Sequence, residues 1–242
     1  MNDMIRLPSF ETPMRAVVVG GGGVGAAISD TLKASPNVGE VICLSRRPSA
    51  DVSMDVTDLT SIALAAEAVK ARGPLDLVFV ATGVLHDDEV SPEKNLSALD
   101  PLAMAHLYQV NTIGPAMVAK HFLPLLVKGR KSAFAALSAR VGSIGDNRLG
   151  GWHSYRASKA ALNMMIRTMS VELRRRNPDA LIVALHPGTV DTALSAPFQR
   201  GVKEGKLFTA DRSARAMLAV LDDLTPEDSG AQFAWDGVRV PE

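Results

Sequence analysis

A tyrosine and a lysine stand four residues apart at Tyr155 and Lys159, within the segment Tyr-Arg-Ala-Ser-Lys. On a helix this spacing places both side chains on one face, one turn apart. A free tyrosine hydroxyl has a pKa of about 10, which is too high for efficient proton transfer near neutral pH. A fixed ammonium group one turn away favours the phenolate and lowers that pKa. The pair therefore predicts general acid and base chemistry.

A run of glycines between Gly20 and Gly25 follows the apolar segment Ala16 to Val19 and opens a helical pattern. The run satisfies the spacing G-x-G-x-x-G, with Gly22 as its middle glycine. Glycines at these positions allow a tight turn and let the backbone approach a pyrophosphate at the helix N-terminus. The strand before and the helix after favour a bound dinucleotide over a flexible turn without a ligand. Together with the tyrosine, this turn suggests hydride transfer coupled to proton transfer.

The second apolar segment ends in Ser45, Arg46 and Arg47. A chain that selects NAD usually carries Asp or Glu here, to accept hydrogen bonds from the ribose hydroxyls, and neither is present. Two arginines and a serine suit a ribose 2′-phosphate through charge-assisted and bidentate contacts. A solvated basic loop tip is the alternative interpretation. We expect NADP(H) to be favoured over NAD(H).

Apolar runs alternate with amphipathic segments of helix length. Such a pattern indicates an α/β fold, a doubly wound parallel sheet of Rossmann type with its ligand at the carboxyl ends of the strands. The expected strands are 16–19, 40–44, 75–81, 132–138, 181–186 and 231–235, and the expected helices run from the glycine turn to about 34 and over 59–71, 101–127, 153–176 and 209–224. Pro115 and Pro124 are expected to kink the third helix. We expect a single domain over residues 1–242.

Length and composition narrow the class of protein. The chain has 242 residues, of which 47% are hydrophobic, so it can bury a sizeable core. Basic and acidic residues balance at 26 each, which gives no global basic field for nucleic acid or an anionic membrane. The single cysteine, Cys43, fits a reducing compartment, and the histidines show no metal-ligand spacing. No targeting or membrane-spanning segment is visible, so we expect a cytoplasmic protein with no metal, nucleic-acid or membrane partner.

The motifs, taken in order, resemble those of the short-chain dehydrogenase/reductase family over nearly the whole chain. The matching segments are the glycine turn, Asp55-Val56, Ala81-Thr82-Gly83, Asn111 in Val-Asn-Thr-Ile-Gly, the Tyr155 and Lys159 pair, and residues 186–192. Within the family, residues 138–144, Gly150-Gly151 and the segment around Tyr155 resemble the carbonyl reductases related to bacterial C-factor.

The resemblance implies a mechanism. Tyr155 would donate a proton to a carbonyl oxygen as hydride reaches the carbon, Lys159 would lower the tyrosine pKa and bind the nicotinamide ribose, and Asn111 would hold a water in a proton relay. The implied cofactor-binding residues are Gly20, Gly22, Gly23, Val24, Gly25, Ser45, Arg46, Arg47, Asp55, Val56, Ala81, Thr82, Gly83, Pro187, Gly188, Val190 and Thr192. The resemblance also implies a small carbonyl or alcohol substrate, a lid at about residues 193–208, and a homodimer or homotetramer.

Two positions depart from the family pattern. The glycine turn is one residue short, with Val19 in place of threonine. The family's serine that polarises the carbonyl is replaced in the pair Ser138-Ala139, so either Ser138 serves after a shift in register, or Ser143 reaches back from the loop, or neither acts. A missing donor costs on the order of a hundredfold in rate.

The favoured function is an NADPH-dependent reductase of small ketones or aldehydes. Reduction of 3-oxoacyl or steroid-type substrates is a second enzymatic interpretation. The alternative from another class is a dinucleotide-binding signalling or regulatory protein with little turnover, which the alanine at position 139 favours and the intact tyrosine and lysine pair disfavours.

Overall fold

The computed structural model describes residues 4–242 and contains one seven-stranded sheet in the order β3-β2-β1-β4-β5-β6-β9, with every neighbouring pair parallel. The strands are β1 (Met14–Val19), β2 (Val38–Ser45), β3 (Val52–Ser53), β4 (Leu77–Val80), β5 (Ser132–Leu137), β6 (Ala180–His186) and β9 (Gln232–Ala234). The helices are α1 (Gly23–Lys33), α2 (Leu59–Lys70), α3 (Pro101–Tyr108), α4 (Gly114–Phe122), α5 (His153–Arg174) and α6 (Ala210–Asp223). The predicted doubly wound α/β fold in a single domain is confirmed.

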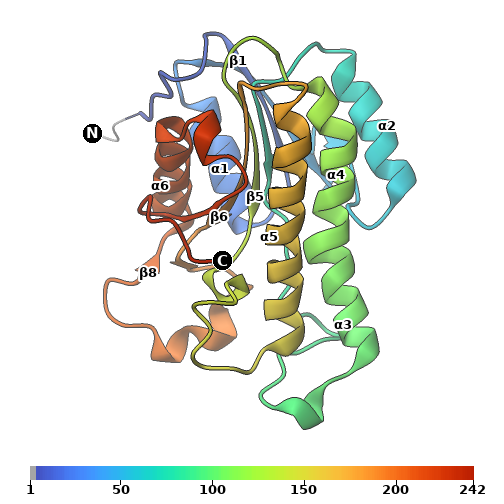
Figure 1. Ribbon diagram of the computed structural model, residues 1–242, viewed down its shortest axis with the longest axis vertical. Coiled ribbons are helices and arrows are strands. Elements are labelled where there is room, and N and C mark those ends of the chain that lie inside the picture. The colour runs from blue at the N-terminus through green and yellow to red at the C-terminus, as the bar shows by residue number, and fades with distance from the viewer. Residues whose placement is uncertain (1–3) are drawn as a thin grey trace.

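Helices cover both faces of the sheet (Figure 1). Helices α1 and α6 pack on one face, and α2, α4 and α5 pack on the other. Side chains of β1 alternate between these layers: Val17 and Val19 join the core under α2, α4 and α5, while Ala16 and Val18 join the core under α1 and α6. Because both faces are buried, the central strands are mainly apolar, as in the LVFV of β4, which is why the sequence pattern located them.

Strand order reverses between β1 and β4, since the chain builds outward first through β2 and β3 and then through β5, β6 and β9. In open parallel sheets the crevice for a ligand lies at such a switch point, at the carboxyl ends of the strands. The glycine turn after β1 and the segment after β4 meet there. The sheet thus brings the two most informative motifs of the first half of the chain together.

The segment 101–127 is not one continuous helix. A π-helical turn, η2 (Gln109–Ile113), separates α3 from α4, and a 3-10 turn, η3 (Leu123–Leu125), follows α4. The irregular turn lies directly before Pro115, and Pro124 falls inside the closing 3-10 turn. Proline has no N–H for the carbonyl four residues earlier, and its ring crowds that carbonyl, which here belongs to Asn111. The sequence therefore placed the disturbance near the right residues: the helix widens into a π-helical turn just before Pro115 and ends in a 3-10 turn at Pro124.

Short elements at the carboxyl end of the sheet were not predicted. Strands β7 (Thr189–Val190) and β8 (Leu207–Phe208) pair in parallel, and a 3-10 turn, η5 (Ala196–Gly201), lies between them. Three further 3-10 turns are η1 (Leu96–Ala98), η4 (Arg140–Gly142) and η6 (Pro226–Asp228). Strands of two residues carry too little periodicity to be recognised from sequence. Within residues 4–242, no helix combines the length and apolar content needed to cross a bilayer.

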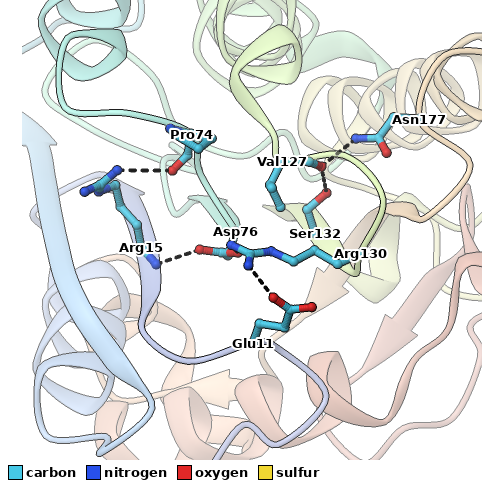
Figure 2. A network of polar contacts seen from close by, with 8 residues as sticks. All are labelled: Glu11, Arg15, Pro74, Asp76, Val127, Arg130, Ser132 and Asn177. Atoms are coloured by element: carbon cyan, nitrogen blue, oxygen red, sulfur yellow. Dashed lines mark hydrogen bonds and ion pairs between the residues drawn. The ribbon is translucent and has the colours of Figure 1, made fainter.

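A polar network ties the amino ends of the central strands together (Figure 2). The buried carboxylate of Asp76 accepts hydrogen bonds from the Arg15 main-chain N–H at 2.8 Å and from Arg130 Nη2 at 2.9 Å. Arg130 also contacts Glu11, while the main-chain carbonyl of Val127 accepts from nearby side chains. This network lies at the edge of the sheet opposite the carboxyl ends, where it links β1 to the residues just before β4 and β5.

Candidate active site

Tyr155 and Lys159 lie in the first two turns of α5, as the sequence predicted, and both are almost fully buried, with exposed fractions of 8% and 2%. Lys159 Nζ lies 5.9 Å from the centre of the tyrosine ring. It also donates a hydrogen bond of 2.8 Å to the main-chain carbonyl of Leu137 at the end of β5. The loop after β5 passes close to the helix, because a Cβ on Gly142 would lie 2.7 Å from Lys159 Cβ. The lysine is thus fixed between the sheet and the tyrosine.

Burial controls the protonation of this pair. It raises the pKa of Tyr155 to about 12 and lowers the pKa of Lys159 to about 7. The direction for the tyrosine is opposite to the one expected from the lysine charge alone, because desolvation penalises the phenolate and the ammonium alike. Tyr155 is therefore protonated throughout the physiological range, which is the state that a proton donor needs.

Asn111 connects three segments around the lysine. Its side-chain amide accepts from the main-chain N–H of Val84 and donates to the carbonyl of the same residue, each at 2.8 Å, and it donates to Ser158 Oγ at 3.1 Å. A Cβ added to Gly83 would lie 3.3 Å from Lys159 Nζ and 3.4 Å from Asn111 Oδ1. The amide therefore fixes the segment after β4 against α5. The main-chain carbonyl of Asn111 lacks its usual helical donor, because position 115 is a proline.

An apolar wall surrounds Tyr155. Leu85, Leu107 and Ala139 form one buried cluster with the tyrosine. Further apolar side chains pack against this cluster, namely Val84, Val141, Trp152, Leu194 and Phe198. The Trp152 ring makes edge contacts with Tyr155, at 6.3 Å between centres, and with Phe198, at 5.1 Å. This wall suits the apolar part of a substrate and keeps water from the tyrosine.

Each candidate serine has a hydrogen-bond partner of its own. Ser138 Oγ donates to Asn163 Oδ1 at 2.7 Å, and the Asn163 amide in turn donates to Gln232. Ser143 Oγ accepts from the main-chain N–H of Asp146, and Ser143 lines a surface groove with Arg156, Ala157 and Ala160 of α5. Successive side chains of an extended segment point to opposite faces, so Ser138 and Ala139 point to opposite sides. Ala139 belongs to the apolar cluster around Tyr155, and that Ser138 or Ser143 assists the tyrosine stays a prediction.

The glycine turn is shaped by close approaches. Gly20 has φ of +115°, and a Cβ on Gly25 would lie 2.1 Å from the Gly20 carbonyl oxygen. A Cβ on Gly23 would lie 2.8 Å from Thr192 Cγ2, so the turn touches the segment after β6. Around Gly22 such an atom would meet nothing within 4 Å. The turn is therefore closed on the protein side and open on the other, which forms a cradle beside Val24 and the start of α1.

Basic side chains flank the end of β2. Arg46 has a side chain that is 79% exposed, and its Nη1 lies 3.8 Å from Asp55 Oδ2. Burial acts to raise the pKa of Asp55, but hydrogen bonds from Thr57 and the Arg46 charge outweigh it, and the net pKa is lowered. Ser45 Oγ accepts from the Arg47 main-chain N–H and would lie 3.0 Å from a Cβ on Gly21. A serine, two arginines and a carboxylate thus stand together beside the turn.

The remaining predicted cofactor residues lie around the same crevice. Ala81 contacts the glycine turn, since its carbonyl oxygen would lie 2.9 Å from a Cβ on Gly20, and Val56 lies against the first residue of α4. Thr82 has a buried Oγ1 with no hydrogen-bond partner among residues 4–242. After β6, Pro187 accepts from Ser213 Oγ, and Gly188, with φ of +79°, lies against Phe208. Val190 is buried in β7. The open cradle and the unpaired threonine hydroxyl fit a bound dinucleotide.

Comparison with known proteins agrees with this geometry. The family model described as short chain dehydrogenase matches residues 15–203. The C-signal protein of Myxococcus xanthus is 40% identical over 147 residues, which cover 60% of this chain and 82% of that protein. A 1-hydroxy-2-glutathionyl-2-methyl-3-butene dehydrogenase of a Rhodococcus species is 37% identical over 185 residues, covering 76% of each chain. The NADPH-bound carbonyl reductase from chicken fatty liver superposes with a TM-score of 0.83 at 29% identity, covering 97% of this chain and 96% of the other.

A doubly wound fold with a glycine cradle and a buried tyrosine and lysine pair defines a dinucleotide-dependent oxidoreductase. The chain belongs to the short-chain dehydrogenase/reductase family, and its cofactor is a nicotinamide dinucleotide. It is an NAD(P)-dependent enzyme that acts on CH–OH or C=O groups.

Sequence reasoning missed several residues that shape the site. The sequence assigned Ser158 no role beyond its place between Tyr155 and Lys159, yet its hydroxyl donates to the Tyr155 main-chain carbonyl and accepts from the Asn111 amide. Asn163, one turn beyond Lys159, could have been found from the four-residue spacing. No sequence pattern identified Glu93 as part of the site, because an acidic residue in a loop is ordinarily solvated.

Proposed function

We propose that this protein is an NADPH-dependent carbonyl reductase in which Tyr155 is the general acid and base. The observation that carries the proposal is the buried arrangement of Tyr155 and Lys159 on one side of α5, facing an apolar wall at the carboxyl end of the sheet. The bound dinucleotide supplies the hydride. The chain supplies a protonated hydroxyl whose pKa is about 12, so the proton leaves only as negative charge develops on the substrate oxygen.

The other residues support that transfer. Lys159 restores the proton on Tyr155 and binds the ribose, while Asn111 orders the segment around it and holds a water in the proton relay. The apolar side chains around Tyr155 exclude bulk water and strengthen each polar interaction with the developing oxyanion. A small ketone or aldehyde with an apolar substituent fits this wall.

The cofactor preference rests on the end of β2. Arg46 and Arg47 place two cations beside the glycine turn, and β2 ends in Ser45 where an NAD-selective chain usually has a carboxylate. The nearby Asp55 is held in an ion pair with Arg46. These contacts favour a 2′-phosphate, so the proposal is for NADPH over NADH.

The direct test is Tyr155→Phe, assayed by NADPH oxidation with a panel of aliphatic and aromatic carbonyl compounds. The variant should lose turnover while its Kd for NADPH changes less than about threefold, because only the hydroxyl is removed. A kcat near that of the wild type would remove the tyrosine from the mechanism. Equal calorimetric affinities of the wild type for NADPH and NADH would overturn the cofactor assignment.

A second candidate is a dinucleotide-binding signalling or regulatory protein with little turnover. Ala139 in the Tyr155 cluster favours it, since the oxyanion has one donor fewer, and the relative from Myxococcus xanthus is named C-signal. Tight NADPH binding without steady oxidation on the whole panel would select this function.

Three further expectations belong to the same proposal. Residues 193–208 act as a substrate lid: Leu194 and Phe198 already pack on the wall beside Tyr155. The protein acts in the cytoplasm, which its single free cysteine favours. It forms a homodimer or homotetramer, and a monomer mass by light scattering at micromolar concentration would contradict this.

A further inference from the structure

The start of α5 lacks the usual capping arrangement. Its N-cap residue is Trp152, which makes no side-chain capping hydrogen bond, and no acidic residue lies in the first turn. Trp152 has φ of 53° and is the one non-glycine residue with positive φ among residues 4–242. Such a conformation is strained for an L side chain and persists only where the surroundings enforce it. Some other group must hold the first turn of the helix that carries Tyr155.

Glu93 is that group. Its carboxylate oxygens accept from the main-chain N–H of Ser154 at 3.2 and 3.3 Å, and the Ser154 hydroxyl also contacts Oε1. Its main-chain carbonyl accepts from the N–H of Trp152 at 2.6 Å. Glu93 belongs to the connection between β4 and α3, 61 residues before Ser154 along the chain. A distant loop thus provides the cap that the local sequence does not.

The burial of Glu93 distinguishes it from a surface contact. Only 5% of the residue is exposed, and Ser154 is fully buried. A buried carboxylate is costly unless its lone pairs are satisfied, and the Ser154 N–H, the Ser154 hydroxyl and the positive end of the helix dipole satisfy it here. The contact is therefore shielded from water, and Ser154 lies one residue before Tyr155.

We propose that Glu93 is a positioning residue for the reaction: it fixes the first turn of α5 and the left-handed Trp152, and so sets both the Tyr155 hydroxyl and the aromatic wall. This rests on the proposed role of Tyr155 as general acid. Catalytic groups must be held to within a fraction of an ångström, and a frayed first turn would not meet that demand. The same loop reaches the lid, since His86 Nε2 lies 3.1 Å from the Leu194 carbonyl oxygen.

The test compares Glu93→Ala with Glu93→Gln and with the control Glu89→Ala, an exposed residue on the same loop. Glu93→Ala should lower kcat by about tenfold or more, with the Kd for NADPH within about twofold of the wild type. Glu93→Gln keeps one oxygen for the Ser154 N–H and should recover kcat to within about threefold. Hydrogen exchange should quicken at residues 153–158 in Glu93→Ala and not at the glycine turn.

Several results would overturn the proposal. A kcat of Glu93→Ala within threefold of the wild type, or a glutamine variant as slow as the alanine variant, would exclude positioning. Equal losses of kcat and NADPH affinity would show a general structural defect. Should Glu93→Ala not fold, Ser154→Ala removes one contact to the carboxylate and must still lower kcat with NADPH affinity intact. Wild-type protein with no turnover on any carbonyl would overturn the proposed function, and hydrogen exchange would then still decide whether Glu93 holds the first turn.

Discussion

Replacing Lys159 by methionine tests how burial sets the protonation of the site. The lysine is 2% exposed, and its pKa falls from 10.5 to about 7 on folding. Between these two values the unfolded chain keeps a proton that the folded chain has lost, so the folded state gains stability as pH rises. Below about pH 6 the lysine is protonated in both states and contributes no pH dependence.

The expected size follows from the two pKa values. Proton linkage uses a pKa of about 7 in the folded state and 10.5 in the unfolded state. Between about pH 7 and about pH 9, it raises the free energy of unfolding of the wild type by about 2 kcal/mol relative to that of Lys159→Met. Methionine removes the charge and keeps much of the apolar stem, and the loss of the bond to Leu137 adds an offset that does not vary with pH. The pH-dependent part of the difference therefore belongs to the lysine.

Urea denaturation of both proteins at a series of pH values measures the difference. Lys120→Met, an exposed lysine on α4, is the matched control and should give a curve parallel to the wild type. Parallel curves for wild type and Lys159→Met over the same range would refute the argument, since they would mean that the buried lysine keeps the pKa it has in the unfolded chain.

Three more substitutions test other parts of the site and fold. Arg46→Asp should weaken NADPH binding by about tenfold or more and erase the preference over NADH, while the exposed control Arg175→Asp should not, as calorimetry would show. Ser138→Ala and Ser143→Ala, tested singly, should lower kcat by more than about threefold for one serine and not for the other. If neither variant does so, the site works without a serine, and a rise in kcat with Ala139→Ser would place the missing hydroxyl at that position. Asp76→Ala should lower the free energy of unfolding by about 2 kcal/mol, because it removes the acceptor of Arg130 and of the Arg15 N–H. The control Glu11→Gln, at an exposed carboxylate, should lower it by less than about 1 kcal/mol. Equal losses for the two variants in urea denaturation would contradict this.

The sequence by itself determined the fold and the chemical class of the site. Strands buried on both faces read as unbroken apolar runs, and the glycine turn, Tyr155 and Lys159 are local patterns in which spacing alone fixes the geometry. Helix periodicity is enough to place the tyrosine and the lysine on one face. These features depend on residues that are near one another along the chain.

Only the tertiary structure decided what depends on distant neighbours. The tyrosine pKa moved opposite to the sequence-based expectation, because burial, with Leu85, Leu107 and Ala139 packed around the ring, raises it. Ser138 donates a hydrogen bond to Asn163, a contact that exists only because α5 packs beside the end of β5. Glu93 became the cap of α5 across 61 residues of chain, a contact for which no local pattern exists. Desolvation and long-range hydrogen bonds arise only when separate elements pack, so they cannot be read from spacing.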